Sequence, residues 1–368
     1  MKYIEDFRDQ KLAAKLLDDL ARVAGRLNRK ATLMEVCGTH TMSIYRHGLK
    51  GMFPPQIKLV SGPGCPVCVT PMGYVDLAIE LARKPGVIIT TFGDMIKVPG
   101  RSSSLARERG LGADVRVVYS PPDAVGIARA NPDRQVVFLG VGFETTAPSV
   151  AGAIVLARRG GVSNYSVLCA HKVMPEPMEA LTSGELKLDG YICPAHVSAI
   201  IGEEGYKPLA EKYGIPCVIT GFEPLDIIRG VTMLVRQVAE GRAEVENEYD
   251  RVVLPGGNKK AQALLADVFV KADAVWRGLG LIPQSGLSIA PGYAQYDAAK
   301  KFALAEPDSR ENPACICGEI LKGLKEPLDC KLFGKTCDPE NPIGACMVSS
   351  EGTCAAEYRY GERRPAHA

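Results

Sequence analysis

The sequence predicts an α/β fold, with two α/β/α domains built on mainly parallel sheets and a small irregular C-terminal domain. Short apolar runs alternate along the chain with segments of helical periodicity. These runs are apolar on both faces, which is typical of parallel strands that helices cover on each side. After about residue 305 the periodicity gives way to a stretch rich in Pro, Gly and Cys. A core without a metal is not expected there.

Buried strands are predicted wherever an apolar run is bounded by Gly, Pro or Asp. They occupy residues 32–36, 87–91, 115–119, 135–140, 165–170, 190–194 and 216–220. Amphipathic helices are predicted from the spacing of apolar residues, at residues 11–28, 226–240 and 260–277. From this order we expect a first α/β domain over 1–130 and a second over 131–255. A helical segment over 256–305 is expected to pack back on these two domains, and residues 306–368 are expected to form the domain that binds the iron–sulfur cluster discussed below.

Composition limits the class of protein. The formal net charge of 368 residues is +2 and there is one Trp, so neither nucleic acid nor an anionic membrane surface is an expected partner. No apolar run approaches the length of a membrane span, and the charged first residues do not resemble a signal peptide. The expected location is the cytoplasm.

The strongest chemical signal is a group of six cysteines near the C-terminus, out of twelve in the chain. In a reducing compartment such a group predicts metal ligands rather than disulfides. Structural zinc sites draw on close Cys pairs, whereas here most gaps are long, which favours an iron–sulfur cluster over zinc. Spacing does not say which four bind. The six are Cys315, Cys317, Cys330, Cys337, Cys346 and Cys354.

A second signal is the Cys65-Pro-Val-Cys68 motif, which precedes a predicted helix. A helix N-terminus favours the thiolate form of cysteine, so this pair is expected to be a redox dithiol or a metal chelate. The alternative is two small buried apolar side chains. Because two glycines and a proline precede the motif, we expect an exposed, shaped loop instead.

The third signal is Cys37, at the end of the predicted strand 32–36, with His40 three residues later. A thiol at the carboxyl end of a parallel strand stands where ligands bind in such sheets. His40 is expected to act as a ligand or proton carrier. A purely structural role for both residues is the alternative.

Three carboxylates, Asp94, Glu144 and Glu223, also follow predicted strands. They are candidates for positioning a group or accepting a proton, and helix capping explains them equally well. His171 and His196 follow strands too, with ligand and structural roles both open. Cysteines inside strands are expected to be core residues: Cys169, Cys193 and Cys217.

Five segments of the chain carry a resemblance to a known family. They are MEVCGTHTMSIYRHGLK, LVSGPGCPVCVTP, TFGDMIKVPG, GFETTAP and PIGACMVSSEGTCAAEYRYG. These segments are similar to the signature segments of the HypD family of hydrogenase maturation factors, and the similarity runs from about Lys30 to Gly361.

The resemblance implies a scaffold that works with a HypC-type chaperone to assemble the Fe(CN)2CO unit of NiFe hydrogenase. HypE would donate cyanide, and the hydrogenase large subunit would be an indirect partner. The resemblance also implies a 4Fe-4S cluster and an additional iron that carries cyanide and CO. It places the iron on Cys37 and the redox pair at Cys65 and Cys68. Its four cluster ligands are Cys315, Cys330, Cys337 and Cys354.

Two other functions compete with this one: an iron–sulfur thiol oxidoreductase that acts on a protein disulfide, and a zinc-stabilised binding protein. A disulfide reductase needs no third thiol such as Cys37. Zinc protein would be colourless. Whether the chain is an enzyme in the usual sense stays open.

Overall fold

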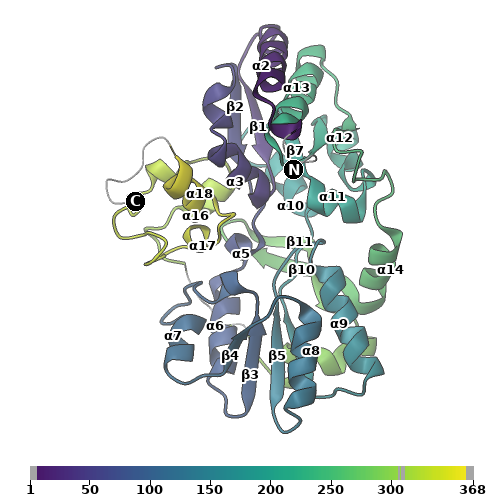
Figure 1. The fold of residues 1–368 in the computed structure, drawn as a ribbon, viewed down its shortest axis with the longest axis vertical. Helices are drawn as coiled ribbons and strands as arrows, with labels where there is room; N and C mark the ends of the chain where they lie inside the picture. The colour runs from purple at the N-terminus through teal and green to yellow at the C-terminus, as the bar shows by residue number, and fades with distance from the viewer. Residues whose placement is uncertain (1–5, 306, 308–310, 362–368) are drawn as a thin grey trace.

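The computed structural model describes the chain except residues 1–5, 306, 308–310 and 362–368, so the outer ends of the first and last predicted domains lie outside it. Two α/β halves lie end to end, and the C-terminal tail packs at one side of their junction (Figure 1). An antiparallel hairpin runs between the halves (Figure 1). The α/β class with mainly parallel sheets and a small C-terminal region is therefore confirmed.

The first half is built on a five-stranded sheet, the β1 sheet, in the order β2-β1-β7-β8-β9 with all pairs parallel. Helices α2 and α13 pack together over one face, where Leu20, Leu33 and Val231 are buried. The elements are β1 (Ala31–Glu35), β2 (Ile57–Ser61), β7 (Gly190–Pro194), β8 (Cys217–Thr220), β9 (Val245–Asn247), α2 (Gln10–Ala24) and α13 (Pro224–Glu240).

The second half is built on a parallel four-stranded sheet, the β3 sheet, in the order β4-β3-β5-β6. Alternate residues of its strands face opposite helices: Ile88 packs in the cluster with α8 and α9, and Ile89 in the one with α6. The elements are β3 (Val87–Thr91), β4 (Val115–Val117), β5 (Gln135–Gly140), β6 (Tyr165–Cys169), α6 (Met72–Ala82), α7 (Leu105–Gly110), α8 (Pro121–Ala130) and α9 (Ala147–Arg159).

The predicted domain boundary at residue 130 needs correction. The chain forms β1 and β2, then builds the whole β3 sheet, and returns to add β7, β8 and β9 to the first sheet. A boundary at 130 would separate β3 from β5, which are hydrogen-bonded neighbours. The apolar pattern of a strand says that it is buried but not which strand it pairs with, so this excursion was not visible in the sequence.

The predicted helix 260–277 is also corrected, and with it the helical segment 256–305. Helix α14 (Lys259–Val268) ends where β10 (Phe269–Trp276) begins, and β10 pairs antiparallel with β11 (Gly280–Ile289). Gly278 and Gly280 have φ of 78° and 82°, a conformation that allows a tight turn there. β-Branched residues and these glycines favoured a hairpin over the helical spacing that the prediction followed.

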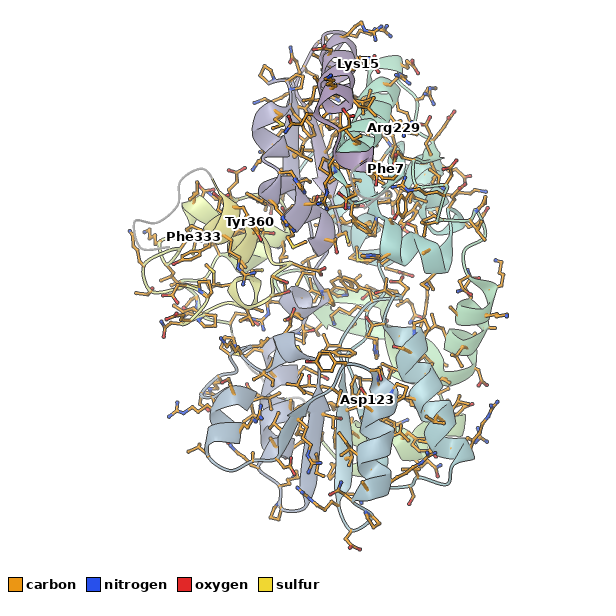
Figure 2. All side chains as sticks on the ribbon, in the orientation of Figure 1. Phe7, Lys15, Asp123, Arg229, Phe333 and Tyr360 are labelled. Atoms are coloured by element: carbon orange, nitrogen blue, oxygen red, sulfur yellow. The ribbon has the colours of Figure 1, made fainter. Side chains whose placement is uncertain are left out.

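Shorter helices connect these elements and form the tail. Helix α5 lies between the two halves and the tail (Figure 1), and side chains occupy the space around it (Figure 2). No helix in the described part of the chain is long and apolar enough to cross a membrane. The α-helices are α3 (Gly38–Arg46), α4 (Leu49–Met52), α5 (Pro66–Val69), α10 (Pro175–Thr182), α11 (Ala195–Ile201), α12 (Lys207–Tyr213), α15 (Ala298–Lys301), α16 (Cys317–Leu321), α17 (Ala345–Val348) and α18 (Thr353–Tyr360).

Short 3-10 helices complete the described elements. They are η1 (Asp6–Arg8), η2 (Gly93–Met95), η3 (Glu204–Tyr206), η4 (Pro291–Tyr296) and η5 (Pro327–Asp329).

Candidate functional site

The Cys37 and Cys65–Cys68 motifs meet because they follow neighbouring parallel strands. β1 and β2 pair with Glu35 opposite Ser61, so the two loops leave the sheet side by side. The Gly38 N–H donates to the Gly64 carbonyl at 2.9 Å. A Cβ on Gly64 would lie 2.2 Å from the Cys37 nitrogen, so only glycine allows this approach of the two backbones.

Cys37 lies at the point where strand order reverses in the β1 sheet. From β1 the chain goes to β2 on one side, whereas β7, β8 and β9 extend the sheet on the other side. Ligands of open α/β sheets bind at the carboxyl ends of strands at such a point. Cys37 therefore lies at the carboxyl edge of the sheet, as predicted.

Cys37 is the N-cap residue of helix α3 and is nearly enclosed, with 7% of the residue exposed. Burial, together with the nearby Glu351 carboxylate, raises the pKa of Cys37 to about 12, although the backbone N–H groups of Thr39 and His40 oppose this shift. The metal-free thiol is therefore protonated near neutral pH. A metal that binds it must displace that proton.

A buried carboxyl group, Glu35, supports the Cys37 backbone. Its Oε2 accepts the Cys37 N–H at 3.1 Å, and its Oε1 accepts the Thr41 hydroxyl. Burial raises the pKa of Glu35 to about 8. Sequence reasoning missed this residue, although a glutamate inside an otherwise buried strand was a visible signal.

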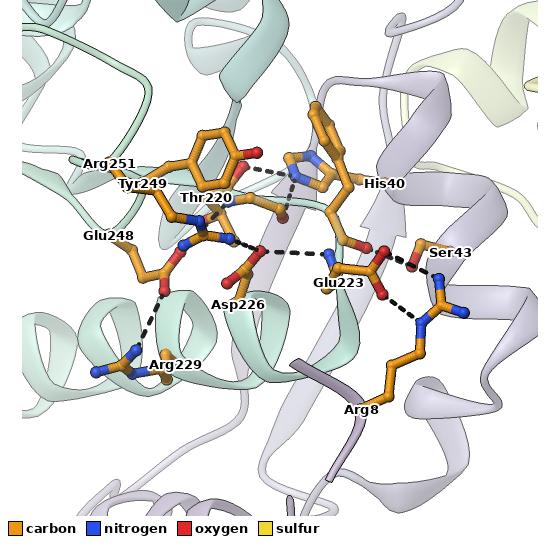
Figure 3. Close-up of polar contacts among 12 residues, drawn as sticks. Arg8, His40, Ser43, Thr220, Glu223, Asp226, Arg229, Glu248, Tyr249 and Arg251 are labelled. Atoms are coloured by element: carbon orange, nitrogen blue, oxygen red, sulfur yellow. Dashed lines mark hydrogen bonds and ion pairs between the residues drawn. The ribbon is translucent and has the colours of Figure 1, made fainter. Parts of the chain in front are cut away.

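His40 joins the Cys37 loop to the end of β8 (Figure 3). Its Nε2 donates to the carbonyls of Thr220 and Gly221 at 2.9 and 3.0 Å, which fixes the neutral tautomer with its proton on Nε2. Burial lowers the pKa of His40 to about 4. The Nδ1 atom is buried and has no hydrogen-bond partner among the described residues. The ring also contacts Phe222, at 4.8 Å between centroids.

The tail closes over the Cys37 loop. A Cβ on Gly38 would lie 2.4 Å from the Glu351 Cβ, and the Thr39 hydroxyl donates to Glu351 at 2.7 Å. Two residues earlier, the Ser349 hydroxyl donates to Asp94 at 3.2 Å, beside the end of β3. Glu351 was not predicted as a site residue. Its tail segment thus contacts the carboxyl ends of strands from both halves.

All six tail cysteines line one small cavity with mainly apolar walls, here called the sulfur cavity. The Ile343 N–H donates to the Cys337 sulfur at 3.4 Å. A Cβ on Gly344 would lie 2.8 Å from the Cys315 sulfur, so a side chain there would intrude on the cavity. Its lining residues are Cys315, Cys317, Ile320, Cys330, Leu332, Phe333, Cys337, Gly344, Cys346, Met347 and Cys354.

The donor set of this cavity fits an iron–sulfur cluster. Thiolates in apolar surroundings, with backbone N–H groups directed at sulfur, are the usual ligand shell of such clusters. Among the described residues, no group of three or more His, Cys, Asp or Glu side chains is arranged as a site for a single metal ion.

The Cys65–Cys68 pair contacts the sulfur cavity through Cys346. The sulfurs of Cys317 and Cys346 lie 3.2 Å apart, and hydrogen bonds with Cys317 and then Cys68 lower the pKa of Cys346. Burial raises the pKa of Cys68. The expected exposed loop is corrected: Cys65 and Cys68 are only 3% and 0% exposed, because α17 packs against α5.

The three predicted carboxylates have different surroundings. Asp94 is exposed and accepts a hydrogen bond from the Ser349 hydroxyl. Glu223 is the N-cap residue of α13, so helix capping explains it. Its carboxylate also pairs with Arg8 at 2.6 Å (Figure 3). Glu144 is buried and accepts the Met174 N–H at 2.9 Å, and burial raises its pKa to about 7. This hydrogen bond ties Glu144 to the start of α10 rather than to a cysteine motif.

The remaining candidates are partly structural. Cys193 and Cys217 are buried strand residues, as predicted, whereas Cys169 is partly exposed and lies 3.3 Å from the Nδ1 atom of His171. The His196 ring contacts Phe222 at 4.1 Å between centroids, on a ring that His40 also contacts.

Comparison with known proteins agrees with the resemblance noted in the sequence. The model of the family described as "Hydrogenase formation hypA family", HypD, matches residues 11–361. The hydrogenase maturation factor HypD of Azotobacter vinelandii is 50% identical over 100% of this chain and 98% of its own length. The HypD proteins of Rhodobacter capsulatus and Escherichia coli are 48% and 43% identical, over 100% and 99% of this chain and the same shares of their own. The chain therefore belongs to the HypD family of hydrogenase maturation factors.

Proposed function

We propose that this chain is the scaffold on which, together with a HypC-type partner, the Fe(CN)2CO unit of NiFe hydrogenase is assembled. Cys37 holds the iron, which is cargo, and Cys65 and Cys68 form a redox dithiol. The observation that carries the proposal is the meeting of three sulfur motifs. Cys37 contacts the loop that precedes Cys65, and Cys68 lies beside Cys346 at the sulfur cavity.

Cys37 is suited to hold a low-spin iron. Thiolate is a soft ligand, which such an iron prefers to a hydroxyl or carboxylate oxygen. Binding releases the thiol proton, and the Glu351 carboxylate, which acts on the pKa of Cys37, is the proposed acceptor. Glu35, with a pKa of about 8, already holds a proton near neutral pH. A cysteine of the HypC-type partner supplies a second ligand in this proposal, and HypE supplies cyanide.

The tail is proposed to hold a 4Fe-4S cluster through Cys315, Cys330, Cys337 and Cys354. All four line the sulfur cavity, and so do Cys317 and Cys346, which the family resemblance leaves outside the ligand set. When bound, such a cluster supplies single electrons. A chain with this many free thiols suits the reducing cytoplasm.

The dithiol is proposed to exchange with the cavity thiols. A disulfide of a partner that oxidises Cys65 and Cys68 to a disulfide takes up their two electrons and two protons and becomes two thiols. Cys346 contacts both Cys68 and Cys317. Thiol–disulfide exchange can therefore move the disulfide from the Cys65–Cys68 pair to the thiols of the sulfur cavity. Attack by the Cys346 thiolate on a Cys65–Cys68 disulfide would form a Cys68–Cys346 bond and release the Cys65 thiolate.

Infrared spectroscopy tests the scaffold function. Protein purified without oxygen together with its small partner should show bands of metal-bound CO and cyanide. Protein that carries a cluster and yet shows no such bands, from cells that make active hydrogenase, would contradict the proposal.

The contact between Cys68 and Cys346 also favours a second function, an iron–sulfur thiol oxidoreductase that acts on a protein disulfide. This function does not need Cys37. A Cys37→Ala variant that reduces a protein disulfide at the wild-type rate and still supports hydrogenase maturation would favour it over the scaffold.

A further inference from the structure

A buried arginine, Arg277, lies against the end of helix α5, which carries Cys68, and its hairpin turn contacts the residue that follows Cys317. It follows Trp276 at the end of β10, in the tight turn of the hairpin. Only 3% of the residue is exposed, although it carries a permanent charge. Trp276 beside it is fully buried and donates from Nε1 to the Ser285 hydroxyl at 2.8 Å, so the base of the turn is firmly held.

Arg277 binds the end of the dithiol helix. Its backbone N–H donates to the Val69 carbonyl at 2.9 Å, and its Nε donates to the Thr70 carbonyl, also at 2.9 Å. Val69 is the last residue of α5, which carries Cys68, and Thr70 is its C-cap. The hairpin turn therefore fixes the end of the helix that holds the Cys65–Cys68 pair.

The same turn packs against the start of the cluster-binding segment. A Cβ on Gly278 would lie 2.2 Å from the Gly318 Cα, so the two backbones are in direct contact one residue after Cys317. The Arg277 charge acts electrostatically on Cys315. Arg277 also acts electrostatically on Cys317.

The guanidinium is only partly neutralised. Its Nη1 pairs with the Glu311 carboxylate, whose side chain is 39% exposed and which also accepts the Met72 N–H at 3.3 Å. Its Nη2 is buried and has no hydrogen-bond partner among the described residues. A buried donor without a partner is costly, and in an otherwise well-bonded residue it calls for an acceptor.

We propose that Arg277 is a positioning residue that raises the reduction potential of the cluster in the sulfur cavity, with Glu311 as its counter-charge. This assignment rests on the proposed function, because it needs a cluster at the tail cysteines. Reduction of a cluster adds one negative charge, and a fixed cation in a low-dielectric site stabilises the reduced form. The same side chain holds α5, so one residue sets both the potential and the place of the dithiol.

The test measures the midpoint potential of the cluster in three full-length variants, by redox titration under visible and electron paramagnetic resonance spectroscopy. Arg277→Gln removes the cation and should lower the potential. Glu311→Gln removes the counter-charge and should raise it. We expect a change of about ten-fold in the reduction equilibrium, which is about 59 mV for a one-electron couple. Glu319→Gln removes an exposed carboxylate two residues after Cys317, and solvent screening should leave its potential close to wild type.

Opposite shifts in Arg277→Gln and Glu311→Gln support the assignment, since a purely structural role would not reverse sign with the sign of the charge. Shifts in the same direction, or none in either variant, overturn it while the cluster itself remains. If Arg277→Gln does not fold, Glu311→Gln still decides: an unchanged or lower potential overturns the assignment. Wild-type protein without a cluster would instead overturn the proposed function, and this assignment with it.

Discussion

The two sulfur sites of this chain are held in opposite ways. Cys37 follows β1, inside a five-stranded parallel sheet. Glu35, Gly64 and helix α3 fix its backbone. The tail cysteines lie on loops and short helices around a cavity. The apolar core of the sheet forms the first site without help from a metal. The buried side chains of the second are part of the large core cluster that it shares with the two halves, and the proposed cluster would add to its folding free energy.

The largest expected effect comes from removing a cluster ligand. Cys330→Ala or Cys337→Ala takes a thiolate from the sulfur cavity, so the cluster, about four irons, and its visible absorption should be lost. The α/β halves should keep their structure. Iron analysis, visible spectra and circular dichroism of anaerobic protein measure both outcomes.

Two variants serve as controls for that loss. Cys217→Ala changes a fully buried thiol in β8 and should keep the full absorption. Cys346→Ala should also keep the cluster, because the family resemblance leaves Cys346 outside the ligand set. If Cys346→Ala bleaches the protein and Cys330→Ala does not, the proposed ligand set is wrong.

The sheet-held site should respond to backbone packing. Gly64→Ala places a Cβ 2.2 Å from the Cys37 nitrogen, which forces the two loops apart. We expect a loss of about 1–3 kcal/mol in the free energy of unfolding, together with loss of the iron cargo. Urea denaturation and iron analysis measure these effects.

Gly126→Ala is the matched control for Gly64→Ala. Gly126 lies in α8, and a Cβ there meets no atom within 4 Å. Alanine should stabilise that helix by roughly 0.5–1 kcal/mol. Equal effects of the two variants would show that the Cys37–Gly64 contact does not hold the site.

The dithiol should be redox-active although it is buried. Cys65 and Cys68 should appear as a disulfide in part of the molecules under graded redox buffers. Their short helix α5 lies outside both sheets, so its backbone can adjust to form the bond. Cys193 and Cys217, also in contact but fixed in the β1 sheet, should stay reduced. Thiol alkylation with mass spectrometry distinguishes the two pairs. A disulfide found only at the second pair would rule out the redox role of the first.

The smallest expected effect concerns the stability of the β3 half, far from the sulfur sites in its chemistry. A hydrogen bond from Arg83, then one from Ser103, lowers the pKa of Glu108 to about 2. The carboxylate therefore stabilises the fold fully above its unfolded pKa of about 4.3, and this contribution is lost as pH falls from there toward 2.

Glu108→Gln should cost about 1 kcal/mol at pH 7, a value reduced because Arg83 is half exposed, and should flatten the acid limb of the stability curve. Glu80→Gln breaks the exposed pair with Lys84 and should cost roughly 0.3 kcal/mol. Urea denaturation between pH 2 and 7 compares them. A Glu108→Gln protein with an unchanged acid limb would contradict the assignment.

Much of the fold was predictable because buried parallel strands leave a clear local pattern. The strands at 87–91, 135–140 and 190–194 have the predicted bounds. Their assignment to two sheets was not predictable, because β7 returns to β1 after more than a hundred residues. The β10–β11 hairpin was missed because its apolar residues also fit a helical stripe.

The candidate site was predictable where chemistry is local to a motif. Cys37, the Cys65–Cys68 pair and the six tail cysteines stood out by residue type and spacing, and the structure brings them together. Glu351 and Arg277 could not be found in this way. Their importance comes from contacts with residues more than two hundred positions away, which no spacing rule records.

The central claim is that the iron cargo and the cluster occupy separate sulfur sites. The most direct test is infrared and visible spectroscopy on anaerobic Cys37→Ala protein that is co-purified with its small partner, beside wild type. We predict that the CO and cyanide bands disappear while the cluster absorption remains, and that Cys37→Ser behaves the same way, since a hydroxyl is a poor ligand for low-spin iron. Bands that persist in Cys37→Ala, or a cluster lost together with them, would contradict two separate sites.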